Sequence, residues 1–340
     1  MAAEPPVGSP LSLHDPRSVG PWQVHSRLGS GGMGVVYYAT AHGSQAALKV
    51  IRPGLLDSPA TRERFSREVA ILRAVRDVHI SQFIDADLDT EPAWLAIEYL
   101  SGPVLRDEVA ENGPLAEDDW WSLARGLAQA LAVLDVHRIT HRDLKPGNVI
   151  LHERGPVLID FGIAVPEDAT SLTATGLVTG SPAWLSPEQA NLEHTGPASD
   201  IFALGSLLAF AATGRPPFGE GMSVAVLMSI ASREPDLAGV DPARGVLLRR
   251  MLAKDPAARP TAREVLSIAR LGPQSLAGLA GLVGPEEAFG EADEPSDATR
   301  VSPREAATGA YEVPAHDTLP GLLGGGEPAA APPAAGSVGG

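Results

Sequence analysis

The chain of 340 residues contains no cysteine. Disulfides, thiolate metal sites and thiol redox chemistry are therefore excluded. Aromatic residues make up only 5% of the chain, and 26 Lys and Arg residues stand against 42 Asp and Glu residues, for a net charge of −16. This acidic balance argues against a general nucleic-acid-binding surface, because the phosphate backbone requires clustered positive charge.

Long hydrophobic runs are also lacking. No stretch reaches the roughly 18 apolar residues of a membrane-spanning helix. The N-terminus does not have the basic, apolar and small-residue pattern of an export signal. We therefore expect a cytoplasmic protein that does not contact a membrane.

Composition divides the chain into three parts. A hydrophobic content of 44% is enough for one two-lobed domain of about 250 residues. Residues 272–340 are rich in Pro, Gly and Ala and carry ten acidic residues against two arginines, which is a net charge of −8. With so few apolar residues, this tail cannot offset the entropy cost of ordering, and we expect it to be disordered. Residues 1–21 are predicted to be flexible, which leaves 22–271 as the folded domain.

The most informative segment is His141–Asn148, with the sequence HRDLKPGN, which is followed by the triplet DFG beginning at Asp160. Phosphoryl transfer passes through a loose transition state, so catalysis depends on positioning and charge neutralisation. Asp143 would orient the attacking hydroxyl and accept its proton, and Lys145 would face the γ-phosphate. Asn148 and Asp160 would hold Mg²⁺. The spacing therefore predicts a phosphotransferase active site.

A glycine-rich segment, Leu28–Val36, matches the pattern G-x-G-x-x-G-x-V between two strand-like stretches. The same glycines could open a dinucleotide-binding unit, which requires a helix directly afterwards and an acidic residue about 20 positions on. A second strand pattern, Gln45–Ile51, follows instead. In such a hairpin, glycine amides would close over the phosphates while Lys49 would reach the α- and β-phosphates from the neighbouring strand.

A catalytic lysine on a strand needs a carboxylate to orient it. The stretch Pro59–Val75 has apolar residues at helical spacing and contains Glu68 and Glu63. Glu68 is our prediction for the partner of Lys49, because it directly precedes the apolar run of this helix. The alternatives are Glu63, or an exposed helical ion pair made by Glu68 itself.

From about Trp22 to about Leu271, the chain resembles a bacterial serine/threonine protein kinase of the eukaryotic-like (Hanks) type, similar to actinobacterial members. Ser186-Pro187-Glu188 stands where the family has A-P-E, and Arg259 stands where the family has the ion-pair partner of that glutamate. Asp200 matches the buried aspartate that braces the catalytic loop.

The resemblance implies an α+β fold of two lobes. A small β-rich N-lobe with one regulatory helix would span about 22–100, and a larger, mainly helical C-lobe would span about 101–271.

The resemblance also implies ATP and Mg²⁺ as cofactors. Ile97 would be the gatekeeper, and backbone groups of Glu98 and Leu100 would hydrogen-bond adenine. The remaining residues expected to bind the nucleotide are Leu28, Gly29, Ser30, Gly31, Gly32, Met33, Gly34, Val36, Ala47 and Lys49.

Arg142, next to the catalytic Asp143, implies control by phosphorylation of the activation loop, because the arginine would gain a phosphate partner there. By position, Thr173 and Thr175 most resemble the autophosphorylated pair of bacterial relatives. In the substrate-binding loop, Ser181 replaces the usual Thr and Trp184 the usual Tyr. A hydroxyl is retained at Ser181, so we expect specificity for Ser and Thr.

We therefore expect an ATP-dependent serine/threonine protein kinase that acts on protein substrates, with self-association for trans-autophosphorylation left open. Two alternatives remain. A pseudokinase scaffold would usually have lost the equivalent of Lys49, Asp143 or Asp160. A small-molecule phosphotransferase should lack the Glu188 and Arg259 pair.

Overall fold

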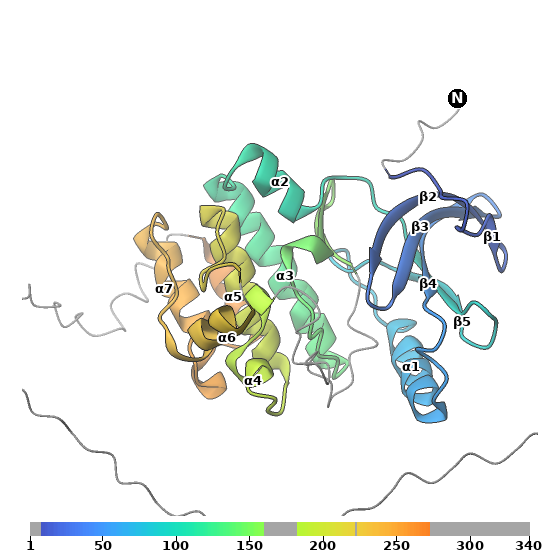
Figure 1. Ribbon diagram of the computed structural model, residues 1–340. Helices are drawn as coiled ribbons and strands as arrows, with labels where there is room; N and C mark the ends of the chain where they lie inside the picture. Colours follow the sequence, from blue (N-terminus) through green and yellow to red (C-terminus); the bar gives the residue numbers. More distant parts are fainter. Residues whose placement is uncertain (1–7, 160–181, 222, 273–340) are drawn as a thin grey trace, which may run out of the picture. The chain divides into compact units, whose positions relative to one another are not determined.

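The computed structural model describes residues 8–159, 182–221 and 223–272 of the chain (Figure 1). Asp160, Thr173, Thr175 and Ser181, to which the sequence analysis gives roles, lie outside the described residues. So does the predicted disordered tail beyond Gly272.

The N-terminal part of the fold is a six-stranded antiparallel sheet in the order β1-β2-β3-β4-β6-β5 (Figure 1). One helix, α1 (Pro59–Leu72), accompanies it. The mixed α+β composition predicted for this lobe is confirmed. The strands are β1 (Ser18–Val19), β2 (Trp22–Gly31), β3 (Gly34–Ala41), β4 (Ser44–Ile51), β5 (Phe83–Asp87) and β6 (Trp94–Glu98).

Neighbouring residues of β6 belong to two different core clusters. Leu95 packs in the cluster that contains Phe65 of α1, whereas Ala96 packs in the cluster that contains Trp22 of β2. Successive side chains of a strand point to opposite faces, so the two clusters cover the two faces of the sheet here. The sheet is thus held from both sides.

The C-terminal part is mainly helical. Helix α5 (Pro197–Thr213) lies at its centre, and its residues Ser199–Ala211 are all buried. A helix that is apolar all round belongs in a core, and Pro197 at its start and the left-handed Gly214 just after its end set its limits. Helix α3 packs beside α5, where the indole N–H of Trp120 donates to the carbonyl oxygen of Leu208 at 2.7 Å.

The remaining elements complete this helical part. Its α-helices are α2 (Leu105–Asn112), α3 (Glu117–Val136), α4 (Pro187–Ala190), α5 (Pro197–Thr213), α6 (Ser223–Ser232), α7 (Pro242–Met251) and α8 (Ala262–Leu271). The short 3-10 helices are η1 (Pro146–Asn148), η2 (Pro182–Trp184) and η3 (Pro256–Ala258), and the hairpin strands are β7 (Val149–His152) and β8 (Gly155–Leu158). None of the helices in the described residues is long and apolar enough to cross a membrane.

An N-terminal strap, residues 8–17, lies against the sheet. Ser9 and Arg27 exchange two backbone hydrogen bonds of 2.9 Å. The buried carboxylate of Asp15 accepts from Tyr37 at 2.7 Å and from Arg27 at 2.6 Å. The sequence predicts a flexible segment over residues 1–21, whereas the described part of it is bonded to β2 and β3. The sequence of this segment did not indicate that Asp15 would bind Arg27 and Tyr37, which lie 12 and 22 residues further along the chain.

The hydrogen bonds of Asp15 in the strap should contribute to the thermal stability of the protein. The hydrogen bonds from Tyr37 and from the backbone of Ser12 hold the pKa of Asp15 far below its usual range. We expect Asp15→Ala to lower the midpoint of thermal unfolding by several degrees, because Arg27 and Tyr37 would lose a buried acceptor. Leu13→Ala, at an exposed position of the same strap, is the control. Equal calorimetric midpoints for the two variants would contradict a stabilising role for Asp15.

Candidate active site

The segment before η1 is a catalytic loop held by a buried carboxylate. Backbone N–H groups of His141 and Arg142 donate to the two oxygens of Asp200, at 2.7 and 2.9 Å. Arg142 has a φ of +64°, a left-handed conformation that is unfavourable for an arginine and that persists only where its surroundings hold it. The two hydrogen bonds supply that restraint, and the prediction that Asp200 braces this loop is confirmed.

The structure brings together two predicted catalytic residues and one predicted metal ligand. Lys145 Nζ donates to Asp143 Oδ2 at 2.6 Å. Asn148 Nδ2 donates to the same oxygen at 3.1 Å and to the Asp143 carbonyl oxygen at 2.7 Å. The Asp143 side chain is 40% exposed, so it is accessible to a substrate. Among the described residues, both side-chain bonds to this carboxylate end on Oδ2, so Oδ1 is the oxygen that we expect to accept a proton.

The donor set of this loop fits a magnesium ion. The side-chain nitrogen of Asn148 donates its hydrogen bonds to Asp143. The side-chain oxygen of Asn148 is then the atom that can serve as a hard metal ligand. Within the described ranges, no group of three or more His, Asp or Glu side chains could hold a metal ion by itself. Mg²⁺ usually takes one or two carboxylates together with substrate phosphates, so Asn148 with Asp160 would be a sufficient protein contribution.

The glycines at the end of β2 and the start of β3 differ in how closely other atoms approach them. A Cβ atom on Gly34 would collide with the carbonyl oxygen of Val50, so packing of the chain itself demands glycine there. A Cβ atom on Gly29 or Gly31 would meet nothing within 4 Å. Glycine at these two positions is thus not required by neighbouring protein atoms, and it leaves the backbone open to a phosphate.

Lys49 lies close to this turn. On β4 it pairs with Val36 of β3, and its Nζ contacts the sulfur atom of Met33 at 3.7 Å. On α1, Glu68 is half-buried, as expected at the edge of the apolar face. The alternative residue Glu63 is exposed and lies 3.6 Å from Arg67, which favours Glu68. The ion pair between Lys49 and Glu68 stays a prediction.

Glu98, at the end of β6, forms an ion pair that the sequence did not predict. Both carboxylate oxygens of Glu98 accept from Arg154, in the turn between β7 and β8, at 2.8 Å. Hydrogen bonding from Arg154 lowers the pKa of Glu98. The N–H of Glu98 donates to the carbonyl oxygen of Gln82 at 2.8 Å. The carbonyl oxygen of Glu98 is then the group that we expect to meet adenine, beside Ala47, which pairs with Ile97.

A buried ion pair supports the segment that follows the predicted activation loop. Arg259 donates to both oxygens of Glu188 at 2.7 and 2.8 Å, and the hydroxyl of Ser199 donates to one of them at 2.7 Å. Burial alone would raise the pKa of Glu188, but these donors outweigh it and the pKa is lowered. The pair predicted from the family resemblance is confirmed. Breaking such a buried pair costs about 3–5 kcal/mol.

The same segment is tied to the catalytic loop. Ser186 and Gln189 form a reciprocal capping box at the start of α4. The side chain of Gln189 also donates to the carbonyl oxygen of Arg142 at 3.0 Å. The residue beside Asp143 is therefore held by Asp200 on its N–H side and by Gln189 on its carbonyl side.

Asp200 predicts a specific pH dependence of stability. Its burial raises its pKa from 3.8 to about 6, although the backbone hydrogen bonds oppose this. Between about pH 4 and 6, the folded chain then keeps a proton on Asp200 that the unfolded chain has released. The contribution of this group to the free energy of unfolding must therefore fall as the pH rises through this window.

We expect the difference in unfolding free energy, wild type minus Asp200→Asn, to fall by about 2 kcal/mol from pH 4 to pH 7. Urea unfolding at a series of pH values measures this difference. Asp118→Asn, at an exposed position of α3, controls for the loss of one carboxylate. A difference for Asp200→Asn that stays constant over the range would contradict the raised pKa.

Comparisons with known proteins agree with this geometry. Residues 22–269 match the family described as "Protein kinase domain". The chain is 41% identical over 259 residues to the "Probable serine/threonine-protein kinase PkwA" of Thermomonospora curvata, covering 76% of this chain and 35% of that protein. It is 42% identical over 253 residues to the "Serine/threonine-protein kinase AfsK" of Streptomyces coelicolor, covering 74% of this chain and 32% of that protein.

The chain thus spans about a third of the length of these two relatives. The match covers strands β2 to β6, the catalytic loop and the helical part as far as α8. It therefore includes the loop that brings Asp143, Lys145 and Asn148 together. The chain belongs to the protein kinase family and resembles its bacterial, Hanks-type members.

Proposed function

We propose that this chain transfers the γ-phosphate of ATP to Ser and Thr hydroxyl groups of proteins. The observation that carries the proposal is the accessible Asp143, which shares one oxygen between Lys145 and Asn148 and keeps the other available. A general base must be within reach of the proton that it accepts. The restraint of the loop by Asp200 supports that positioning.

In the proposed step, the substrate oxygen forms a bond to the γ-phosphorus while the bond from that phosphorus to the bridging oxygen of ADP breaks. The hydroxyl proton goes to Oδ1 of Asp143. Lys145 lies 2.6 Å from the other oxygen, and its charge can also offset the charge on the transferring phosphoryl group. Mg²⁺, held by Asn148 and Asp160, would supply further neutralisation of the phosphates.

Nucleotide binding is assigned to the other lobe. The open glycines Gly29 and Gly31 would let backbone amides approach the phosphates, and Lys49, which contacts Met33 of the same turn, would reach the α- and β-phosphates. Adenine would lie against the sheet at the end of β6, with Glu98 and Leu100 providing backbone hydrogen bonds.

The two alternatives have less support. A small-molecule phosphotransferase is expected to lack the pair of Glu188 and Arg259, and this pair is present and buried. A pseudokinase is expected to have lost Lys49, Asp143 or Asp160, and all three are in the sequence. Self-association and the cytoplasmic location stay predictions from the sequence.

Loss of the assigned charges should stop the reaction without unfolding the protein. We expect Lys49→Met and Asp143→Asn to lower phosphoryl transfer at least about 100-fold, because each group acts on the transition state. Glu68→Gln should lower the rate as well. Glu63→Gln, on the same helix but exposed, is the matched control and should retain it. Transfer is measured as ADP release, and retained activity in Asp143→Asn would refute the assignment of the base.

Autophosphorylation is the regulatory part of the proposal. After incubation of the full chain with ATP and Mg²⁺, we expect mass spectrometry to find phosphate on Thr173 or Thr175 in the wild type but not in Asp143→Asn. Replacing both threonines with alanine should lower the rate and leave a basal turnover, because Arg142 loses its phosphate partner. Thr299→Ala, in the tail, is the control. Full activity of the double variant would exclude this switch.

A further inference from the structure

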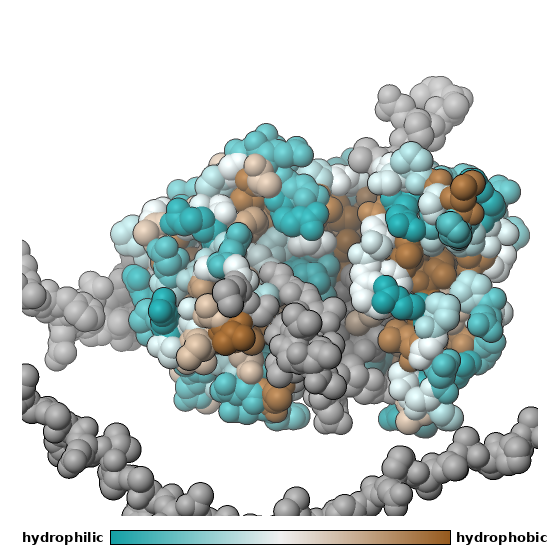
Figure 2. Space-filling view, in the orientation of Figure 1, coloured by the Kyte–Doolittle hydropathy of each residue, from teal (hydrophilic) through white to brown (hydrophobic). Residues whose placement is uncertain are grey.

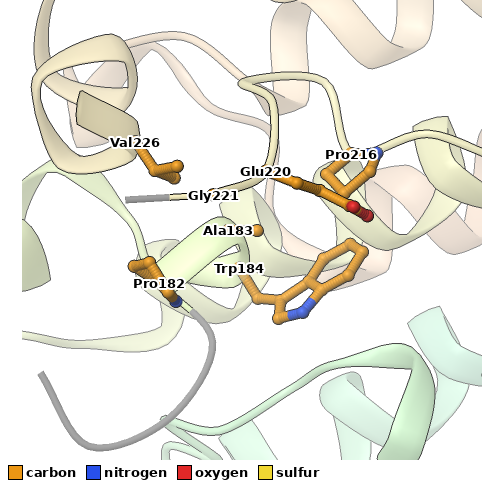
Figure 3. Close-up of a pocket in the computed structure, with 7 residues that line it drawn as sticks. All are labelled: Pro182, Ala183, Trp184, Pro216, Glu220, Gly221 and Val226. Carbon is orange, nitrogen blue, oxygen red and sulfur yellow. The ribbon is translucent and has the colours of Figure 1, made fainter. Parts of the chain in front are cut away.

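A pocket of about 260 Å³ lies beside η2, in the helical part of the protein (Figure 3). We infer that it binds the cationic side chain of a Lys or Arg residue of the protein substrate. This inference rests on the proposed function. The pocket is lined by Pro182, Ala183, Trp184, Pro216, Glu220, Gly221 and Val226.

The size of the pocket limits what it can hold. Pockets for drug-sized ligands are about 300–1,000 Å³, so this one is suited to a single large side chain rather than to a nucleotide. Its walls are firm, because the ring of Trp184 packs edge-on against Phe210 with centroids 5.5 Å apart. The pocket is therefore a preformed site for one residue of a longer partner.

An apolar patch lies on the helix that forms one side of the pocket. Figure 2 shows brown atoms gathered over α6, where Val224 and Met228 are 62% and 67% exposed. Within the pocket, Pro182, Trp184 and Val226 offer apolar surface along which an aliphatic stem can lie. Apolar walls by themselves would accept any large hydrophobic side chain, so the charge in the pocket decides the choice.

Glu220 is the single charged residue that lines the pocket, and it is exposed. In Figure 3 its carboxylate points to the side of the pocket where Trp184 and Pro216 lie. Among the described residues, no ion pair includes Glu220. Arg215, the neighbour of Pro216, lies 3.7 Å from Asp236, which balances its charge.

This combination selects a long cation. A Lys or Arg side chain can lay its stem on the apolar walls and bring its charge to Glu220. Arginine has the further advantage that its planar group stacks on an indole such as that of Trp184. An aspartate or glutamate would be repelled by Glu220. The net charge of −16 adds a general attraction for cationic partners.

The pocket is connected to the catalytic loop through one short segment of the chain. Its residues Pro182 and Trp184 belong to η2, which is followed directly by the capping box of α4. Gln189 of that box donates to the carbonyl oxygen of Arg142, next to Asp143. A peptide that presents its hydroxyl to Asp143 can therefore place a neighbouring side chain in the pocket.

The experiment compares peptide preferences of full-length variants. A peptide library with a fixed Ser or Thr acceptor, varied at one flanking position at a time, is assayed for kcat/KM with the wild type, Glu220→Gln and Glu220→Lys. We expect the wild type to prefer Arg or Lys over Ala about fivefold at one position, as for a partly exposed charge pair. Glu220→Gln should lose this preference, and Glu220→Lys should shift it towards Asp and Glu.

Two controls separate charge recognition from a general structural effect. Glu111→Gln, at an exposed position of α2, should keep the wild-type preference. Glu111→Gln should also match the wild-type kcat/KM on the peptide with Ala at that position, and the ratio of each kcat/KM to that for the Ala peptide removes any general change in the Glu220 variants. A basic preference that survives in Glu220→Gln, or no basic preference in the wild type, would overturn the inference. A wild type as inactive as Asp143→Asn on every peptide would overturn the proposed function as well.

Discussion

The hydrogen bonds from two successive backbone N–H groups to the buried carboxylate of Asp200 are the interaction on which the rest of the site depends. They hold Arg142 in a left-handed conformation that an arginine rarely adopts. That bend directs Asp143 towards Lys145 and Asn148. Asp200 lies in the first turn of α5, a helix whose residues Ser199–Ala211 are all buried. The position of the catalytic loop is therefore fixed by a helix of the protein core. A carboxylate without solvent is costly, and here its two oxygens each have a donor.

A second set of bonds connects the substrate side of the protein to the same loop. The ion pair of Glu188 with Arg259 fixes the start of α4. The side chain of Gln189 in the same helix donates a hydrogen bond to the carbonyl oxygen of Arg142. The pocket beside η2 is built on this segment. Groups that would select the substrate and groups that would transfer the phosphate therefore share one rigid support. Pre-organisation of this kind lets binding contribute to positioning.

Several functional features depend on long-range contacts that local patterns do not encode. The partners of Asp15 lie 12 and 22 residues further along the chain, and Arg154, which binds the carboxylate of Glu98, lies 56 residues after it. Neither a strand pattern nor a helical period indicates which acidic residue meets which arginine. The predicted flexible N-terminus shows the consequence, since its described residues are bonded to β2 and β3. For Glu98, the resemblance predicted a role for the backbone, whereas the role of its side chain became visible only in the folded chain.

The sequence by itself indicated the family and the two-lobed α+β fold. It also singled out Asp143, Lys145 and Asn148, because phosphoryl transfer requires these residue types within one short loop, whereas Asp200 was found through the resemblance to the family. Only the tertiary structure decided that the bonds from described side chains leave Oδ1 of Asp143 open, that Glu63 points to solvent, and that Glu220 lies in a pocket with Trp184. The physical reason is that a motif specifies which groups must meet. Which atoms remain unpaired, and which distant side chains share a cavity, depends on how the helices and strands pack.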